Sequence, residues 1–180
     1  MQKRDYSCGA AALATLVQYY WEDELTEDQI LHELDVMLTR EEIVDRLKNG
    51  LSLTDLRRVA VRFDYQASIG KLEFNKLAEA KVPLVIGIEI RDYKHFVVFR
   101  GTDGKYVYVA DPARGNVRIP VWKFVESWQE NAVLAVAKKG EDVKDYSALS
   151  ITWDEVLTGE LNRQVIRKNF LGPSPAVWTR

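Results

Sequence analysis

Cys8 is the only cysteine of the chain and lies within the stretch RDYSCGAAALATLVQYY at residues 4–20. Apolar residues recur at helical spacing from Leu13 to Tyr20, which predicts a helix that begins near Cys8, with Asp5 or Ser7 as its N-cap. A thiol in the first turn of a helix lies at the positive end of the helix dipole, which stabilises the thiolate over the thiol. The small residues that follow leave the sulfur sterically open, so Cys8 is a candidate nucleophile. The alternative is a small buried hydrophobic residue, the usual role of a lone cysteine.

A predicted hairpin carries two further candidates, His95 and Asp111. The segments KHFVVFRG (94–101) and KYVYVAD (105–111) are rich in β-branched and aromatic residues, which favours two strands. If the loop is the three residues 102–104, His95 lies directly opposite Asp111, with Cβ atoms about 4.5–5.5 Å apart. A carboxylate there accepts the imidazole N–H and fixes the tautomer. A two-residue loop would shift the register by one residue. The alternative role is a cross-strand pair that only stabilises the sheet.

The three residues together have the composition of a cysteine hydrolase site, with Cys8 as nucleophile, His95 as base and Asp111 as orienting group. Gln2 is a fourth candidate, because its amide N–H can stabilise a developing oxyanion beside the backbone N–H of Cys8. The alternative for Gln2 is a frayed terminal residue.

The surrounding elements change type along the chain. The first third predicts helices, with a capping box at Thr26 and Gln29 and a further helix that begins at Ser52. A final helix is expected over 153–168 with Thr152 and Glu155 as its capping residues. The first third also contains an expected short helix at 41–47. Between the helices of the first third and the final helix, we expect strands at 82–90, 94–101, 105–111, 116–120 and 131–138 and a short helix at 121–128. Helices followed by antiparallel strands predict an α+β domain.

Some residues are expected to have ordinary structural roles. His32 lies among charged and apolar neighbours on a predicted helix, which is typical of a surface or boundary histidine. Trp21, Trp122, Trp128 and Trp153 are expected to be aromatic residues of the core or of a groove.

The bulk composition excludes several classes of protein. The 180 residues are 47% hydrophobic and 29% charged, with a net charge of −2, which disfavours nucleic acid or an anionic membrane as a partner. One cysteine excludes an internal disulfide and every Cys-rich zinc pattern, and with two histidines a His-based metal site is also disfavoured. A cysteine hydrolase mechanism needs no metal or organic cofactor, so none is expected. The sequence shows no signal peptide, and its longest strongly apolar stretch, 82–90, is far short of the ~20 residues that cross a bilayer. Cys8 lies so near the start that we expect a trimmed or mature form.

The segments QKRDYSCGAAALATL (2–16), KHFVVF (94–99) and YVADPARG (108–115) resemble the bacteriocin-processing, or double-glycine leader, peptidases of the papain-like clan. The order of helices before strands agrees with that family. The resemblance implies a papain-like cysteine protease fold, with N-terminal helices packed on an antiparallel sheet. It also implies that Cys8 is the nucleophile, His95 the general base and acid, Asp111 the orienting carboxylate and Gln2 the oxyanion donor.

The resemblance covers roughly residues 1–138 and implies a peptidase domain there. Residues 139–180 have no counterpart in the family core; their polar start and the capping residues Thr152 and Glu155 predict a linker and a C-terminal helical tail. The resemblance implies cleavage after a Gly-Gly leader motif of a secreted peptide or protein, in a stand-alone member similar to those encoded with bacterial secretion or functional-amyloid systems. Components of a secretion system are then expected partners, in the periplasm or cell envelope, with the cytoplasm as the alternative. Two other functions stay open: a non-catalytic peptide-binding domain on the same scaffold, and an acyl transferase or amidase of the same clan. The sequence does not determine the oligomeric state.

Overall fold

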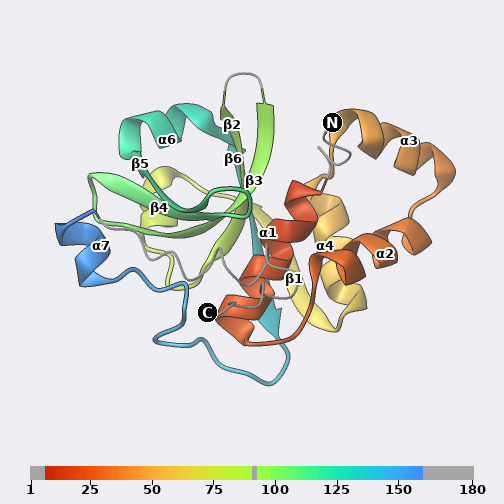
Figure 1. Ribbon diagram of the computed structural model, residues 1–180, viewed down its shortest axis with the longest axis horizontal. Coiled ribbons are helices and arrows are strands. Elements are labelled where there is room, and N and C mark those ends of the chain that lie inside the picture. Colours follow the sequence, from red (N-terminus) through yellow and green to blue (C-terminus); the bar gives the residue numbers. More distant parts are fainter. Residues whose placement is uncertain (1–6, 91–92, 160–180) are drawn as a thin grey trace, which may run out of the picture.

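The computed structural model describes residues 7–90 and 93–159, which form an antiparallel sheet with helices on both faces (Figure 1). The six strands have the order β1-β6-β2-β3-β4-β5. They are β1 (Tyr65–Lys71), β2 (Leu84–Ile90), β3 (Tyr93–Thr102), β4 (Tyr106–Asp111), β5 (Gly115–Pro120) and β6 (Trp128–Lys138). The helices are α1 (Cys8–Leu16), α2 (Glu27–Met37), α3 (Arg40–Asn49), α4 (Leu53–Arg62), α5 (Phe74–Ala78), α6 (Val121–Ser127) and α7 (Trp153–Leu157), with a π-helical turn η1 (Val17–Trp21) after α1. The predicted α+β class is confirmed.

Helix α1 is the central element, because it lies between the sheet and the group formed by α2, α3 and α4 (Figure 1). Sequence spacing predicts one apolar stripe on this helix, but nearly all of its residues after Cys8 are buried. The helix is enclosed on several sides, and its alanines allow these close approaches. At Gly9 a Cβ atom would lie 3.2 Å from side-chain atoms of both Leu56 and Phe96. The start of α1 is therefore pressed directly against β3.

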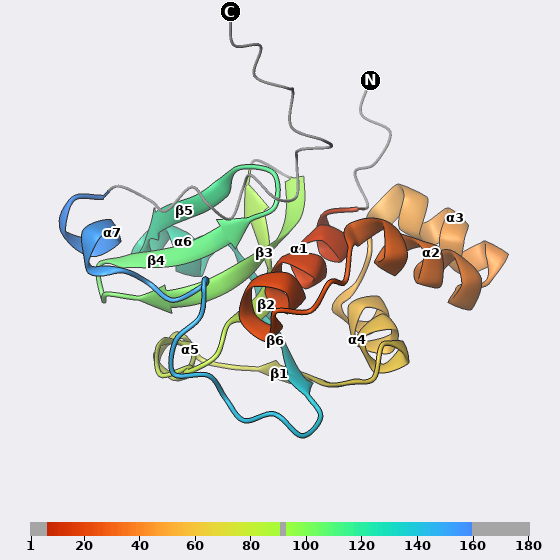
Figure 2. The same cartoon turned by 60° about the horizontal axis from the view of Figure 1, so that its bottom comes forward.

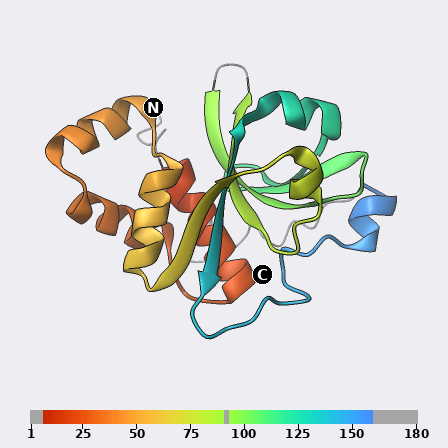
Figure 3. The same ribbon diagram turned by 180° about the vertical axis from the view of Figure 1, so that it is seen from behind.

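The two faces of the sheet bury separate cores. Val85, Val98 and Leu134 face α1, whereas Val97, Phe99 and Phe124 belong to the core on the other face, which α5 and α6 cover (Figure 3). Alternation of side chains along each strand produces this division. Among the described residues, no helix is long and apolar enough to span a bilayer.

The helix starts that the sequence predicts are confirmed where the cap is made by local hydrogen bonds. Thr26 and Gln29 form the predicted capping box at the start of α2. Ser52 caps α4, as predicted, and forms a capping box with Asp55. Ser7 occupies the N-cap position of α1, although its side chain makes no capping hydrogen bond. Asp5 lies outside the described residues.

Two elements are absent from the sequence prediction. Strand β1 is polar and contains Gly70, and it pairs only with β6 at the edge of the sheet, so its conformation depends on a distant partner. Helix α5 has only five residues. Of the four tryptophans expected in the core or in a groove, Trp21 and Trp128 are buried in the core. Trp122 and Trp153 are 65% and 79% exposed on the short helices α6 and α7, so they are not core residues.

The β3–β4 hairpin has a different register from the predicted one. The chain reverses over Gly104 and Lys105, with the Asp103 N–H donating to the Tyr106 carbonyl at 3.2 Å, so the predicted three-residue loop at 102–104 is wrong. Gly101 pairs with Tyr108, but Phe99 pairs with Val109, so Arg100 is an extra residue in a β-bulge.

This bulge decides which side chains share a face. If the pairing of Gly101 with Tyr108 continued without it, Asp111 would lie opposite Val98 and on the other face from His95. With the bulge, the continued register places Asp111 opposite Val97. His95 is then the diagonal neighbour of Asp111 on the same face of the sheet. The backbones of such neighbours are about 7–8 Å apart, a distance that an aromatic side chain such as imidazole can bridge. The predicted direct opposition is therefore wrong, and the shared face is correct.

The segment after β6 returns to the domain. Figure 2 shows it running from the end of β6 to α7 beside β4. The Lys144 N–H donates to the Tyr20 hydroxyl at 3.0 Å, and Leu149 is buried in the core on the α1 face. The predicted capping box of Thr152 and Glu155 is present, but the described helix ends at Leu157, before Gly159 at φ 73°. The remainder of the predicted helix, residues 160–168, lies outside the described residues.

Replacement of Gly9 tests the close packing of α1 on β3. Gly9→Val is expected to lower the free energy of unfolding by about 1–3 kcal/mol, because the added methyl groups overlap with Leu56 and Phe96. Urea denaturation measures this change. Gly70→Val is the matched control, because a Cβ atom at Gly70 meets nothing within 4 Å. Equal stabilities of the two variants would contradict the packing argument.

Candidate active site

Cys8 is the first residue of α1. The first backbone N–H groups of a helix have no partner within the helix, so they create a positive potential at its N-terminus. The Cys8 side chain is half-buried, in contrast to the fully buried residues that follow it. This position suits a sulfur that carries negative charge and must still reach a substrate.

His95 and Asp111 form a hydrogen-bonded pair. The distance between His95 Nε2 and Asp111 Oδ1 is 2.8 Å, and both side chains are buried. Because Asp111 is ionised, the protonated Nε2 atom is the donor of this hydrogen bond and the carboxylate is the acceptor. The structure therefore brings together His95 and Asp111, as the sequence predicts, but as diagonal neighbours on β3 and β4 and not as a directly opposed pair.

The turn after β4 holds Asp111 in place. Its Oδ1 atom also accepts the N–H of Ala113 at 2.8 Å and the N–H of Arg114 at 3.2 Å. The Arg114 guanidinium lies 4.0 Å from the other carboxylate oxygen. Gly115 closes this turn at φ 82°, a conformation that favours glycine. The segment DPARG thus fixes the carboxylate before any substrate is present.

Electrostatics favour the charged forms of this pair. Burial disfavours the imidazolium, but the hydrogen bond to Asp111 and the interaction with Cys8 outweigh it and raise the pKa of His95 to about 9. Burial likewise opposes ionisation of Asp111, yet the hydrogen bond and charge of His95, together with the Ala113 N–H, lower its pKa. His95 is therefore an imidazolium at neutral pH.

The second ring nitrogen of His95, Nδ1, is buried and is not the atom bonded to Asp111. Cys8 interacts with the imidazole in addition to Asp111, and both interactions favour its protonated form. His95 lies where β3 extends past the end of β4, and its neighbour Phe96 packs at Gly9. The imidazole is thus placed between the carboxylate and the first turn of α1.

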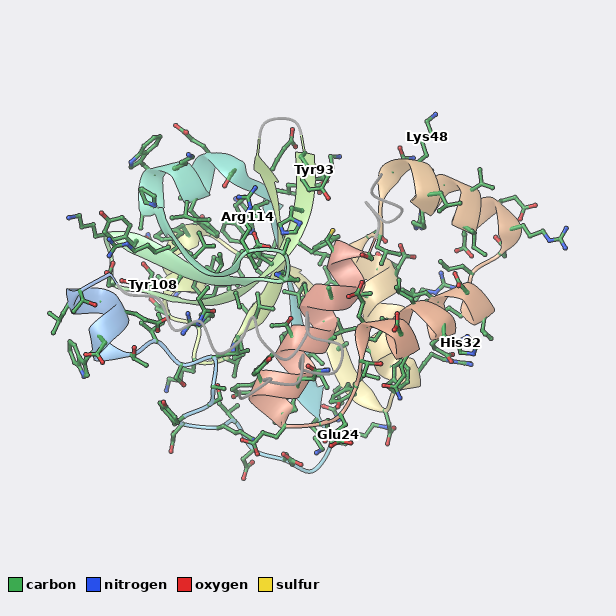
Figure 4. All side chains as sticks on the ribbon, viewed as in Figure 1. Glu24, His32, Lys48, Tyr93, Tyr108 and Arg114 are labelled. Carbon is green, nitrogen blue, oxygen red and sulfur yellow. The ribbon has the colours of Figure 1, made fainter. Side chains whose placement is uncertain are left out.

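Sequence reasoning missed Tyr93, whose ring centroid lies 5.9 Å from that of His95 with an angle of 30° between the planes. The period of two along a strand is the signal that could have found it, since residues 93 and 95 share a face. Figure 4 places Tyr93 and Arg114 toward the same end of the sheet.

Two other candidates lie away from this arrangement. His32 is exposed on α2, beyond α1 from the sheet, as the sequence predicts (Figure 4). Gln2 lies outside the described residues. In the described part of the chain, no group of three or more His, Cys, Asp or Glu side chains is placed to hold a metal ion.

Comparison with known proteins identifies the family of this chain. Residues 1–141 match the model of the Peptidase C39 family. The chain belongs to the peptidase C39 family. Residues 1–141 are the part of the chain that this family model covers.

Curated proteins similar to this chain have names that describe a protease or a processing function. A protein of Pseudomonas aeruginosa described as "Probable functional amyloid protease FapD" is 37% identical over 141 residues, which cover 78% of this chain and 61% of that protein. The protein of the same name from Pseudomonas fluorescens is 36% identical over 142 residues, with the same coverage. The match therefore spans about 61% of the length of these relatives. The "Lactococcin-G-processing and transport ATP-binding protein LagD" of Lactococcus lactis is 24% identical over 130 residues, 71% of this chain and 17% of that protein.

Solved structures confirm the papain-like C39 fold. The crystal structure of a double glycine motif protease from an AMS/PCAT transporter, in complex with the leader peptide, has a TM-score of 0.60 and 28% identity. The match covers 77% of this chain and 89% of that structure. The peptidase domain of Streptococcus ComA has a TM-score of 0.61 at 15% identity, over 77% of this chain and 96% of that domain, which shows the shared fold.

The raised pKa of His95 predicts a specific pH dependence of stability. Because the folded state holds the proton more tightly than the unfolded chain, the stabilisation is complete below about pH 6.5 and is lost as the pH rises through about 9. The loss is expected to be about 3 kcal/mol. Urea unfolding from pH 6 to 9.5 measures it, and His95→Gln is expected to remove this slope. The same decline in both proteins would contradict the assignment.

Proposed function

We propose that this chain is a cysteine endopeptidase in which Cys8, His95 and Asp111 form a catalytic triad. The observation that carries this proposal is the buried 2.8 Å hydrogen bond between His95 and Asp111, with the same imidazole interacting with Cys8 at the first turn of α1. Each residue type then has the partner that its chemical role requires.

The reaction proceeds through an acyl-enzyme. The Cys8 sulfur attacks the peptide carbonyl carbon, after its proton has passed to His95. As the C–N bond breaks, the His95 imidazolium protonates the leaving amine, and a thioester to Cys8 remains. His95 then removes a proton from water, which attacks the thioester and releases the carboxylic acid and the thiol. Asp111 keeps the imidazole in one tautomer and stabilises its protonated form.

The oxyanion of each tetrahedral intermediate needs hydrogen-bond donors. The backbone N–H of Cys8 is one, at the positive end of α1. We assign the second to the side-chain amide of Gln2; one such donor typically contributes about 2.7–4 kcal/mol.

The proposed substrate is a secreted peptide or protein that is cleaved after a Gly-Gly leader motif. The relative described as a double glycine motif protease and the lactococcin-G-processing protein support this class of substrate. The two proteins named as probable functional amyloid proteases support a protein substrate, and the names that mention transport or a transporter support a connection with secretion. Glycine has no side chain, so a Gly-Gly segment can bring its carbonyl carbon close to a sulfur in a narrow site.

Replacement of the triad residues tests the mechanism. Cys8→Ala and His95→Ala are expected to lower kcat/KM for a synthetic Gly-Gly peptide by about 10³-fold or more, because each removes a group that acts as part of one unit. Chromatography with mass spectrometry measures cleavage and identifies the bond. His32→Ala is the control, because this second histidine is exposed on α2. Cleavage rates of His95→Ala equal to those of wild type would end the proposal.

Alkylation separates a catalytic domain from a peptide-binding domain. A catalytic Cys8 is expected to react with iodoacetamide at neutral pH faster than a buried structural thiol does, because it is half-buried at the first turn of α1 and interacts with the His95 imidazole. Mass spectrometry of the intact protein follows the reaction of the single cysteine. Asp111→Asn is expected to slow it at the same pH. Reaction of wild type only at alkaline pH would favour the non-catalytic role.

The identity of the cleaved bond is tested by substitution in the substrate. Replacement of the second glycine by leucine is expected to abolish most cleavage, while the same replacement six residues upstream leaves the bond position unchanged. Continued cleavage at the same rate and position with the leucine peptide would contradict the Gly-Gly specificity and would indicate a peptidase that accepts larger residues at this position.

A further inference from the structure

Arg100 is a buried charged residue in the hairpin that carries His95. It is the extra residue of the β3 bulge, and none of its side-chain surface is exposed. A buried guanidinium is costly unless all of its donors are satisfied. The hydrogen-bond partners of Arg100 therefore identify the segment that stabilises the bulge.

The partners of Arg100 all come from the segment before and within α7. The guanidinium donates to the Glu155 carboxylate twice, from Nη1 to Oε1 at 2.8 Å and from Nη2 to Oε2 at 2.9 Å. Nε donates to the Leu149 carbonyl at 2.8 Å, and Nη2 to the Ser150 carbonyl at 3.0 Å. Glu155 is 1% exposed. We call these four hydrogen bonds the Arg100 clamp.

The same segment covers the backbone of the bulge. Gly101 has φ 146°, and a Cβ atom there would lie 2.8 Å from Ile151 Cδ1. Glu155 is itself held, because its carboxylate also accepts the Thr152 N–H at 3.0 Å in the capping box of α7. The bulge is thus fixed from outside the hairpin, by residues beyond the 1–141 region that matches the family model.

The consequence concerns the active site, because this bulge puts His95 and Asp111 on one face. Without the bulge the pairing beyond Gly101 would place them on opposite faces. Bulges are commonly used beside active sites to re-aim a side chain. Residues 149–155 therefore constrain the base of the proposed triad without touching it.

We propose that Arg100 is a positioning residue, and that the segment 149–155 acts through the Arg100 clamp to hold the bulge that aligns His95 with Asp111. This inference rests on the proposed role of His95. It assigns to the C-terminal segment a part in catalysis as well as in stability.

Arg100→Met is the first test, because methionine keeps an apolar side chain of similar length but loses every hydrogen bond of the clamp. We expect kcat for a Gly-Gly peptide to fall by about 10- to 100-fold, since misplacement of a catalytic group by about 1 Å has effects of this size. KM should stay near the wild-type value, because Arg100 is buried away from substrate. The Nε2–H resonance of His95 in the proton NMR spectrum is expected to shift or be lost.

The matched control is Arg46→Met. Arg46 also donates to a buried carboxylate, that of Asp55, which is likewise the N3 residue of a capping box. This pair joins α3 to α4, away from the hairpin. The control is expected to lower the melting temperature as Arg100→Met does, but to keep both kcat and the Nε2–H resonance. Equal losses of kcat in the two variants, or an unchanged His95 resonance in Arg100→Met, would overturn the proposal.

Two further variants keep the test valid if Arg100→Met does not fold. Arg100→Lys retains a cation for Glu155 but lacks the planar fork, so it is expected to fold and still lose kcat. The double variant Arg100→Met/Glu155→Met removes both buried charges and is expected to regain stability without regaining kcat. Wild-type kcat and resonance in either folded variant would show that the clamp is not required. If wild type itself cleaves no Gly-Gly peptide, the proposed function fails, and the NMR comparison still tests the clamp.

Discussion

The hydrogen bond between His95 and Asp111 is the interaction on which the candidate site depends. Both side chains are buried, so removal of either one would leave the charge of the other without a partner. The ion pair is stable because the imidazole N–H donates directly to the carboxylate oxygen. The turn at Ala113 and Arg114 supplies two more donors to the carboxylate. A carboxylate with three donors stays ionised, and the high pKa of the imidazole follows from it. The hydrogen bonds to Asp111 therefore account both for the position of the imidazole and for its raised pKa.

The position of the sulfur has a different cause, which is packing. Helix α1 is enclosed between the sheet and the helices α2 and α4, and its first turn can approach β3 because Gly9 has no side chain. The helix brings its positive end and Cys8 to the place where β3 extends past β4. A nucleophile carried by one layer of the fold thus meets a base carried by the other, as expected when catalytic groups are placed on rigid elements.

The C-terminal segment connects these features to a part of the chain outside the matched family region. Leu149 completes the core on the α1 face, and the Arg100 clamp closes over the bulge. After residue 141, where the family match ends, the chain packs back on the domain through the Lys144 hydrogen bond to Tyr20 and the buried Leu149. Stability and alignment of the hairpin are then coupled through one buried arginine.

The sequence by itself determined the chemical groups, the α+β class, the capping boxes at Thr26 and Thr152 and the main strands, because these depend on neighbours a few residues apart. It also predicted that His95 and Asp111 meet, although the loop and register behind that prediction were wrong. Only the tertiary structure decided the bulge at Arg100, the edge strand β1 and the approach of Cys8 to the imidazole. Each of these needs partners far away in the chain, such as Glu155 for Arg100, and local periodicity carries no information about such partners.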